Sequence, residues 1–311
     1  MQGLDVQHTL KSAVRFDGIG LHSGLPARMV IHPAAAEHGI WFRRSDVLFG
    51  DAMIPARWDS VRQSPLCTFL ENQQGVSVST VEHVMAALAG CGVHNALVEI
   101  DGPEVPILDG SSAAFVRAIL DRGLRRQSAA VRAIRVLETV EVRRGDAWAR
   151  LTPSDRLEID FRIKFDDAAI GEQSKFLPMS NGTFVRELCD SRTFCRQADV
   201  DAMRAKGLAL GGTLENAVVV DGDRILTPGG LRHKDEAVRH KMLDALGDLA
   251  LAGAPLLGAY TGHRAGHAVT NDLLRALFQR PSAYRMVVCD PATTARLPGV
   301  DIHMDEIPAV A

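Results

Sequence analysis

A five-residue pattern occurs twice in this chain and constrains its fold more than any other feature. Residues 81–85 (VEHVM) and residues 238–242 (VRHKM) share valine, histidine and methionine at matching positions. The two histidines are 157 positions apart (83 to 240), close to half of the 311 residues. Each copy opens an apolar segment with helical spacing that is followed by a strand-like run, as in a duplicated unit. The repeat predicts an α+β protein of two similar halves, each a layered sandwich of sheet and helices.

The division between the halves is expected where a basic, polar stretch occupies residues 125–131. We predict a first α+β domain at 1–127 and a second at 128–311, each long enough to bury its own core. If the two halves face each other, both repeated histidines converge on one cleft. The site is therefore expected between the halves.

Charge and composition exclude several classes of function. A formal net charge of −3 gives no electrostatic reason to expect nucleic acid or an anionic membrane as partner. The most apolar stretch, residues 249–260, is short and holds glycine and proline, so no transmembrane segment is expected. The five cysteines are scattered without a Cys-x-x-Cys pair, which is typical of free thiols in a reducing compartment. A cytoplasmic protein is predicted.

The helix predicted at residues 238–250 carries the first candidate metal ligands. His240, Asp244 and Asp248 recur every four residues, opposite an apolar face. Side chains four residues apart point over the same turn, so His240 and Asp244 can share one metal ion. The alternative interpretation is an ordinary solvated polar face.

The first copy of the repeat supplies a third candidate ligand, His83. A set of two histidines and one aspartate leaves one position open for water, which is the catalytic form of a zinc site. Glu82 lies beside His83 without being needed as a ligand and can serve as general base. The alternative for Glu82 is a capping box with Ser79, because Ser-x-x-Glu fits that pattern.

A second histidine-containing segment, residues 262–267 (GHRAGH), precedes a predicted helix at 271–278. His267 lies close to the start of that helix, and Asp248 lies one turn beyond Asp244. A carboxylate partner favours the protonated imidazole, so His267 paired with Asp248 would make a general acid. The alternative is a polar loop between helices.

Six segments of the chain occur in the order found in one known family. Together they closely resemble the zinc-dependent UDP-3-O-acyl-N-acetylglucosamine deacetylases of lipid A biosynthesis, and the resemblance covers nearly the whole chain. Position 265 is alanine where the family often has serine. The segments are 18–24 (GIGLHSG), 79–83 (STVEH), 105–111 (VPILDGS), 192–194 (RTF), 238–248 (VRHKMLDALGD) and 265–267 (AGH).

The resemblance implies a role for each candidate residue. The metal ligands would be His83, His240 and Asp244, with Glu82 as general base, His267 as general acid and Asp248 as the partner of the acid. Two further groups, Thr193 and Lys241, would stabilise the oxyanion and polarise the amide. The cofactor would be one Zn²⁺ ion, with Fe²⁺ as the alternative ion.

The resemblance also implies the reaction and the substrate. The family removes the N-acetyl group of UDP-3-O-acyl-N-acetylglucosamine, giving acetate and UDP-3-O-acyl-glucosamine, the committed step of lipid A biosynthesis. Each half carries an insert, and the second, near residues 193–220, would form an apolar passage for the acyl chain. An ordinary core explains these apolar residues equally well. The implied substrate-binding residues are Phe165, Phe194, Arg264, Leu208, Gly212 and Val219.

Two other functions remain compatible with the residues. One is a zinc amidohydrolase that acts on another N-acetylated sugar or on a peptide. The other is a non-catalytic sugar-nucleotide binding protein with a structural metal, although structural sites are closed and usually rich in cysteine. Nothing in the sequence requires an oligomer.

Overall fold

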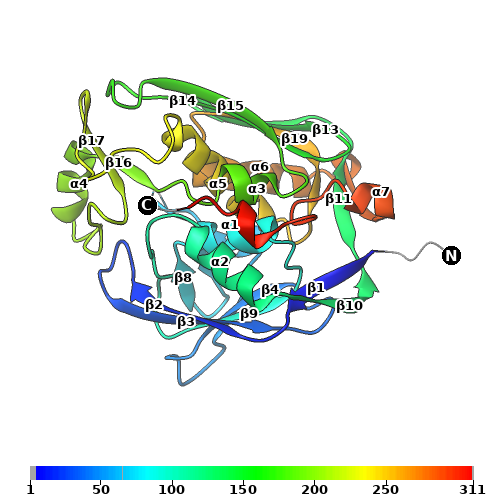
Figure 1. The fold of residues 1–311 in the computed structure, drawn as a ribbon. Coiled ribbons are helices and arrows are strands. Elements are labelled where there is room, and N and C mark those ends of the chain that lie inside the picture. Colours follow the sequence, from blue (N-terminus) through cyan, green and yellow to red (C-terminus); the bar gives the residue numbers. More distant parts are fainter. Residues whose placement is uncertain (1–4, 65, 310–311) are drawn as a thin grey trace.

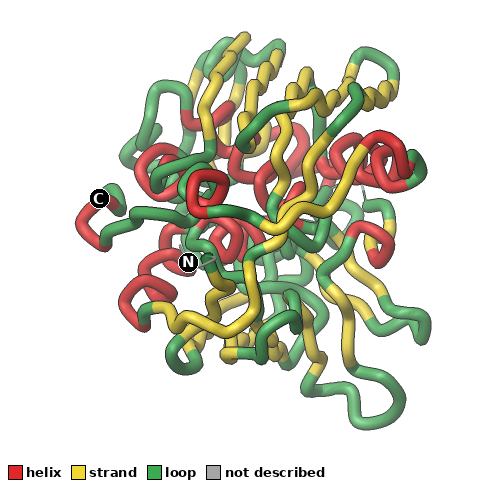
Figure 2. The backbone as a smooth tube through the Cα atoms, turned by 90° about the vertical axis from the view of Figure 1, so that its right-hand side faces the viewer, coloured by secondary structure: helices red, strands yellow, loops and turns green. Residues whose placement is uncertain are grey.

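Two sheets enclose a middle layer of helices. A computed structural model describes residues 5–64 and 66–309. In Figure 1 the sheet of the first half lies at the bottom, the sheet of the second half lies at the top, and most of the labelled helices lie between them. Figure 2, a quarter turn away, shows the same three layers. The helices between the sheets are therefore shielded from solvent on both sides.

The sheet of the first half has five strands in the order β2-β3-β9-β4-β5. β9 lies at its centre, antiparallel to β3 and parallel to β4, and the outer pairs β2/β3 and β4/β5 are antiparallel. The strand bounds are β2 Val14–Ile19, β3 Pro26–Pro33, β4 Ile40–Arg44, β5 Met53–Pro55 and β9 Ala96–Ile100.

The second half repeats this arrangement strand for strand. β19 is antiparallel to β13 and parallel to β14, and the outer pairs β12/β13 and β14/β15 are antiparallel. β11 and β20 extend this sheet to seven strands. The prediction of an α+β chain with two similar halves is confirmed. The bounds are β11 Arg132–Val136, β12 Val140–Arg144, β13 Ala147–Pro153, β14 Leu157–Lys164, β15 Glu172–Pro178, β19 Leu256–His263 and β20 Tyr284–Val288.

The helices follow the same duplication. Each half runs helix, central strand, helix, as α1–β9–α2 and as α5–β19–α6. The α1 and α5 backbones approach closely at Gly247, where an added Cβ would lie 2.0 Å from the carbonyl oxygen of Glu82. The helix bounds are α1 Glu82–Gly90, α2 Ala113–Arg122, α3 Thr183–Glu187, α4 Gln197–Arg204, α5 Glu236–Ala250, α6 His267–Phe278 and α7 Pro291–Thr294.

The remaining strands form three smaller sheets. β1 pairs with β10, β6-β7-β8 form a sheet in the first half, and β16-β17-β18 form one beside α4. β10 runs through residues 127 and 128, so the chain is still in a strand at the boundary predicted from its composition. The bounds are β1 Val6–Leu10, β6 Val61–Arg62, β7 Phe69–Glu71, β8 Ser77–Ser79, β10 Leu124–Ala130, β16 Phe194–Arg196, β17 Val218–Asp221 and β18 Arg224–Ile225.

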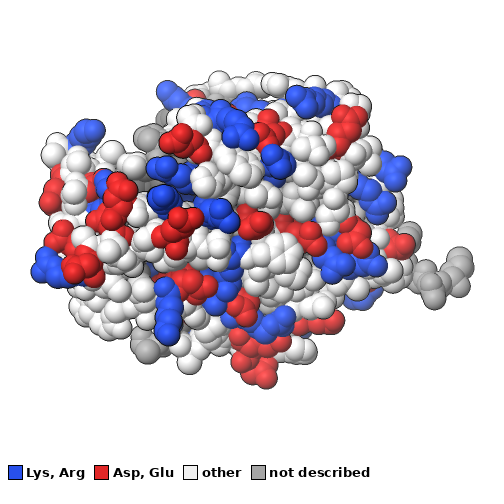
Figure 3. Space-filling model, turned by 90° about the horizontal axis from the view of Figure 1, so that it is seen from above, with Lys and Arg blue, Asp and Glu red and all other residues white. Residues whose placement is uncertain are grey.

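One hydrophobic core joins both halves. Its largest fully buried side chains come from the first half (Phe42, Phe115) and from the second (Phe161, Phe184, Tyr260). The surface seen from above interleaves basic and acidic side chains rather than gathering one sign (Figure 3). Among the described residues, no helix combines the length and apolarity needed to cross a membrane.

Candidate active site

The polar residues of α5 are buried rather than solvated. His240, Asp244 and Asp248 are each at most 4 % exposed, because α5 packs against α1, α6 and strands of the second sheet. The interpretation as a solvated face is therefore wrong. Burying a histidine and two carboxylates is costly unless each is paired or binds a metal.

His83 completes a cluster of three potential ligands. It lies in the first turn of α1, and its Nε2 is 3.6 Å from Asp244 Oδ1, while His240 Nε2 is 3.3 Å from the same oxygen. Ligands 2.0–2.1 Å from a tetrahedral zinc ion lie about 3.3 Å apart. Asp244 Oδ1 is buried and has no hydrogen-bond partner in the described part of the protein. The donor set and this unpartnered oxygen fit a divalent metal ion.

The protonation states of the cluster suit metal binding. Burial lowers the pKa of His240 to about 4, so the ring is neutral. Its Nδ1 is 3.0 Å from the Ser191 carbonyl oxygen, which fixes the proton on Nδ1 and leaves Nε2 as the candidate ligand atom. Burial opposes ionisation of Asp244, but His240 and Lys241 outweigh it and hold its pKa well below the usual range. The Lys241 ammonium donates to Asp244 Oδ2 at 2.7 Å.

Glu82 is aimed at the cluster and does not cap its helix. The N-cap of α1 is Val81 without a side-chain cap bond, and Ser79 Oγ donates to the Pro103 carbonyl instead. The capping-box alternative is therefore wrong. Glu82 Oε2 accepts the Thr68 backbone N–H at 3.0 Å. Burial raises the pKa of Glu82, although His267 and His83 oppose this shift. The raised pKa lies closer to neutral pH, where a general base works best.

His267 lies at the first residue of α6 and faces Glu82 and Asp248. Its Nδ1 is 2.8 Å from Asp248 Oδ2, and its Nε2 is 3.7 Å from Glu82 Oε1. Burial lowers the pKa of His267, but the Asp248 and Glu82 carboxylates outweigh it and raise the pKa to about 9. His267 is thus a cation at neutral pH with a proton on Nε2 available to the site. The interpretation as a polar interhelical loop does not account for this pairing.

Thr68 connects Glu82 to Asp248 and was not predicted. Its hydroxyl donates to Asp248 Oδ1, while its backbone N–H donates to Glu82. It precedes β7 in a short run that from sequence resembles an ordinary strand. A lone threonine there carries no signal, because its partners lie 14 and 180 residues away.

A cavity of about 830 Å³ opens from the cluster into the β16–β18 region. The predicted ligands, Glu82, His267, Lys241 and Thr193 all lie on its wall. Five of the six residues predicted to contact substrate line it as well: Phe165, Phe194, Leu208, Gly212 and Val219. Arg264 does not; its side chain is 45 % exposed, 3.7 Å from Asp146.

A loop of the first half contributes Leu21 and His22 to the lining of this cavity. Glu104, 3 % exposed, accepts the backbone N–H groups of His22 and Ser23 and the Thr80 hydroxyl. His22 lines the cavity, and its Nδ1 is buried without a partner in the described residues. The motif at 18–24 contained His22, but its spacing alone gave no reason to place it here.

A buried cluster of two histidines and an aspartate, with a carboxylate and a protonated histidine beside it, is the arrangement of a metal-dependent hydrolase. The family described as UDP-3-O-acyl N-acetylglycosamine deacetylase (LpxC) matches residues 7–279 of this chain. The chain belongs to that family.

Relatives from several bacteria support this membership. The chain is 50 % identical over 280 residues to the UDP-3-O-acyl-N-acetylglucosamine deacetylase of Phenylobacterium zucineum, covering 90 % of this chain and 96 % of the relative. It is 43 % identical over 286 residues to the enzyme of the same name from Pasteurella multocida, and 46 % over 286 residues to that from Idiomarina loihiensis. In both cases 91 % of this chain and 93 % of the relative are covered. The resemblance inferred from the six segments is thus confirmed.

Proposed function

We propose that this protein hydrolyses the N-acetyl group of UDP-3-O-acyl-N-acetylglucosamine, releasing acetate and UDP-3-O-acyl-glucosamine, the committed step of lipid A biosynthesis. One observation carries the proposal. Asp244 and the two histidines line a cavity whose wall also includes the apolar side chains of Leu208, Leu214 and Val219. Such a site can hold an amide at the metal and a hydrocarbon chain beyond it.

The proposed metal ligands are His83, His240 and Asp244, and the proposed ion is Zn²⁺, with Fe²⁺ as the alternative. Two imidazoles and one carboxylate suit either ion, so the donor set supports both. When bound, the ion supplies Lewis acidity that polarises the amide carbonyl and acidifies water. All remaining steps are assigned to side chains of the protein.

Glu82 is the proposed general base. Its Oε2 is held by the Thr68 N–H, which leaves Oε1, the oxygen nearer His267, to accept a proton from the attacking water. Lys241 and Thr193 are proposed to stabilise the negative charge that develops on the carbonyl oxygen, because both line the cavity beside the cluster.

His267 is the proposed general acid for the leaving amine. Its Nδ1 is engaged by Asp248, so the proton to be transferred is the one on Nε2. The leaving amine would otherwise depart as a strong base, which makes this proton necessary for cleavage of the C–N bond.

The acyl chain is proposed to lie along Leu208, Gly212 and Val219, within the insert at about 193–220. Phe165 and Phe194, whose ring centroids are 5.4 Å apart, would contact the sugar between the metal and the chain. Arg264 is retained as a candidate for contact with the nucleotide at the surface.

Two further assignments concern the division into domains and the compartment. We propose the division into domains 1–127 and 128–311, because each part contains one copy of the repeated sheet. We also propose the cytoplasm as the compartment, since all five cysteines are free thiols and four are buried.

The test is release of acetate from the UDP-linked substrate by the metal-loaded protein, followed by mass spectrometry. Replacing Glu82 with Gln should lower kcat about 10²–10⁴-fold while the metal is retained. Glu71→Gln, at a carboxylate that pairs with Arg62 outside the cavity, is the matched control and should leave kcat unchanged. No turnover of the UDP sugar by a metal-loaded protein would contradict the substrate and favour another N-acetylated compound.

A further inference from the structure

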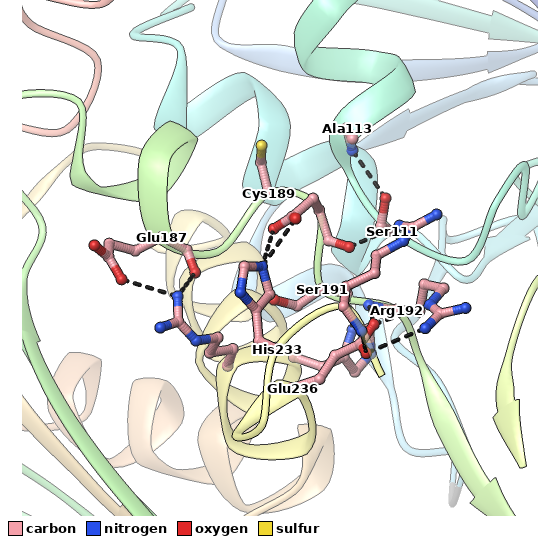
Figure 4. Close-up of polar contacts among 12 residues, drawn as sticks. Ser111, Ala113, Glu187, Cys189, Ser191, Arg192, His233 and Glu236 are labelled. Carbon is pink, nitrogen blue, oxygen red and sulfur yellow. Dashed lines mark hydrogen bonds and ion pairs between the residues drawn. The ribbon is translucent and has the colours of Figure 1, made fainter. Parts of the chain in front are cut away.

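One peptide group links a buried carboxylate to a metal ligand. The carbonyl oxygen of Ser191 accepts the Nδ1 proton of His240 at 3.0 Å, and the N–H of Arg192, in the same peptide group, donates to Glu236 Oε1 at 3.0 Å. Glu236 is the first residue of α5, one turn before His240. Figure 4 shows Glu236 and Arg192 paired beside Ser191.

Glu236 is buried and fully engaged. It is 1 % exposed and accepts the Nε and Nη2 groups of Arg192 at 2.9 and 3.2 Å and the Arg232 N–H at 2.7 Å. Burial opposes its ionisation, but these hydrogen bonds outweigh burial and hold its pKa below the usual range. Glu236 is therefore a carboxylate whose charge faces the N–H end of the Ser191–Arg192 peptide.

We propose that Glu236 is a positioning residue for the metal ligand His240 and acts through the Ser191–Arg192 peptide. A negative charge at the N–H end polarises the peptide and makes its carbonyl oxygen a stronger acceptor for the Nδ1 proton. The ring is then held in the Nδ1–H tautomer, and Nε2 becomes a more basic ligand. The inference deepens the proposed metal site and rests on it.

The segment that carries this peptide is also anchored to the first half. The Ser112 N–H donates to the Cys189 carbonyl at 2.9 Å, and the Thr193 N–H donates to the Gly110 carbonyl at 2.8 Å. These anchors do not involve Glu236. We therefore expect the segment to stay in place when only the charge of Glu236 is removed, so that the effect is seen at His240.

The experiment compares Glu236→Gln with Asp235→Asn. Asp235 is the adjacent carboxylate and pairs with Arg239 and Lys175, whereas the Ser191–Arg192 peptide bonds to the side chains of His240 and Glu236. Zinc dissociation constants are measured by chelator competition, and the melting temperature of the metal-free protein reports the fold. The Glu236 variant should bind zinc about 10–100-fold more weakly, the range found when a group that supports a metal ligand is lost. The Asp235 variant should change by less than about threefold.

Two further measurements distinguish polarisation of the peptide by the Glu236 charge from a purely steric role of Glu236 in packing. In the metal-free protein, the NMR signal of the His240 Nδ1 proton should move upfield in Glu236→Gln, because its acceptor is weaker. Arg192→Lys keeps the backbone N–H and a cation beside Glu236, so it should lose less zinc affinity than Glu236→Gln does. If the Gln variant does not fold, Glu236→Asp, which keeps the charge but withdraws it from the peptide, takes its place and should show a smaller loss in the same direction.

Three outcomes would overturn the inference: unchanged zinc affinity in a folded Glu236→Gln protein, an unmoved Nδ1 proton signal, or an equal loss in Arg192→Lys. A wild-type protein that binds no divalent metal would instead contradict the proposed function. The two failures are therefore distinguishable.

Discussion

Replacing Gly247 with alanine tests whether the close approach of α1 and α5 sets the metal geometry. An added Cβ would lie 2.0 Å from the Glu82 carbonyl oxygen, whereas Cβ contacts below 3.0 Å are essentially never seen. The obstacle is backbone rather than a flexible side chain, so the two helices must separate by about 1 Å. His83 is on α1, and Asp244 is on α5.

The separation should affect stability and catalysis through different routes. Overpacking of this kind costs about 1–3 kcal/mol, which for a protein of this size is a fall of about 1.5–5 °C in melting temperature. The 3.6 Å between His83 Nε2 and Asp244 Oδ1 would widen beyond the spacing that one ion can bridge at normal bond lengths. Misplacement of catalytic groups by about 1 Å can reduce kcat/KM about 10²-fold.

The assay measures zinc content, kcat/KM and melting temperature on the same preparation. Gly102→Ala is the control, because its added Cβ would meet only the Pro26 carbonyl oxygen at 3.9 Å, an ordinary contact. The Gly247 variant should lose zinc and activity together, while the control retains both. Wild-type zinc content and kcat/KM in Gly247→Ala would refute the reasoning that this contact sets the spacing of the ligands.

Four other predictions follow from the site and its cavity. Asp244→Ala should lose most of its bound metal while its far-ultraviolet circular dichroism is unchanged; full metal content would show that Asp244 is not a ligand. The rate should be bell-shaped in pH, falling at low pH as Glu82 is protonated and at high pH as His267 loses its proton near pH 9. Asp248→Asn removes the strongest charge that raises the pKa of His267, so the alkaline limb of kcat/KM should move to lower pH; an unmoved limb would exclude His267 as the acid. A substrate whose acyl chain is cut to acetyl should lose kcat/KM, because each buried methylene contributes about 0.8 kcal/mol; equal values for long and short chains would rule out the passage at 193–220.

The duplication could be predicted from the sequence because the same residues recur at a fixed interval along the chain. Valine, histidine and methionine recur at a fixed interval, and helical and strand periodicities follow each copy. The two five-strand arrangements around β9 and β19 bear this out. The i, i+4 relation of His240 and Asp244 was equally accessible, since a helix fixes it locally.

Burial of these residues was decided by the tertiary structure. The pattern of α5 predicted one apolar and one polar face, and such patterns usually mark a solvated helix. Here α5 lies between α1 on one side and the second sheet on the other, so its polar face is enclosed as well. The lowered pKa of His240 follows from this burial, whereas the raised pKa of His267 follows from the Asp248 and Glu82 carboxylates that the fold brings beside it; neither could be inferred from spacing.

Hydrogen bonds made by backbone groups could not be inferred from the sequence. The Ser191 carbonyl and the N–H groups of Thr68 and Arg192 orient His240, Glu82 and Glu236, yet every residue type except proline offers both groups. The sequence alone indicated the candidate metal ligands, base and acid, and it determined that the chain has two related halves. Only the tertiary structure decided which main-chain groups hold those side chains, because such hydrogen bonds join residues far apart in the chain and depend on position rather than on residue identity.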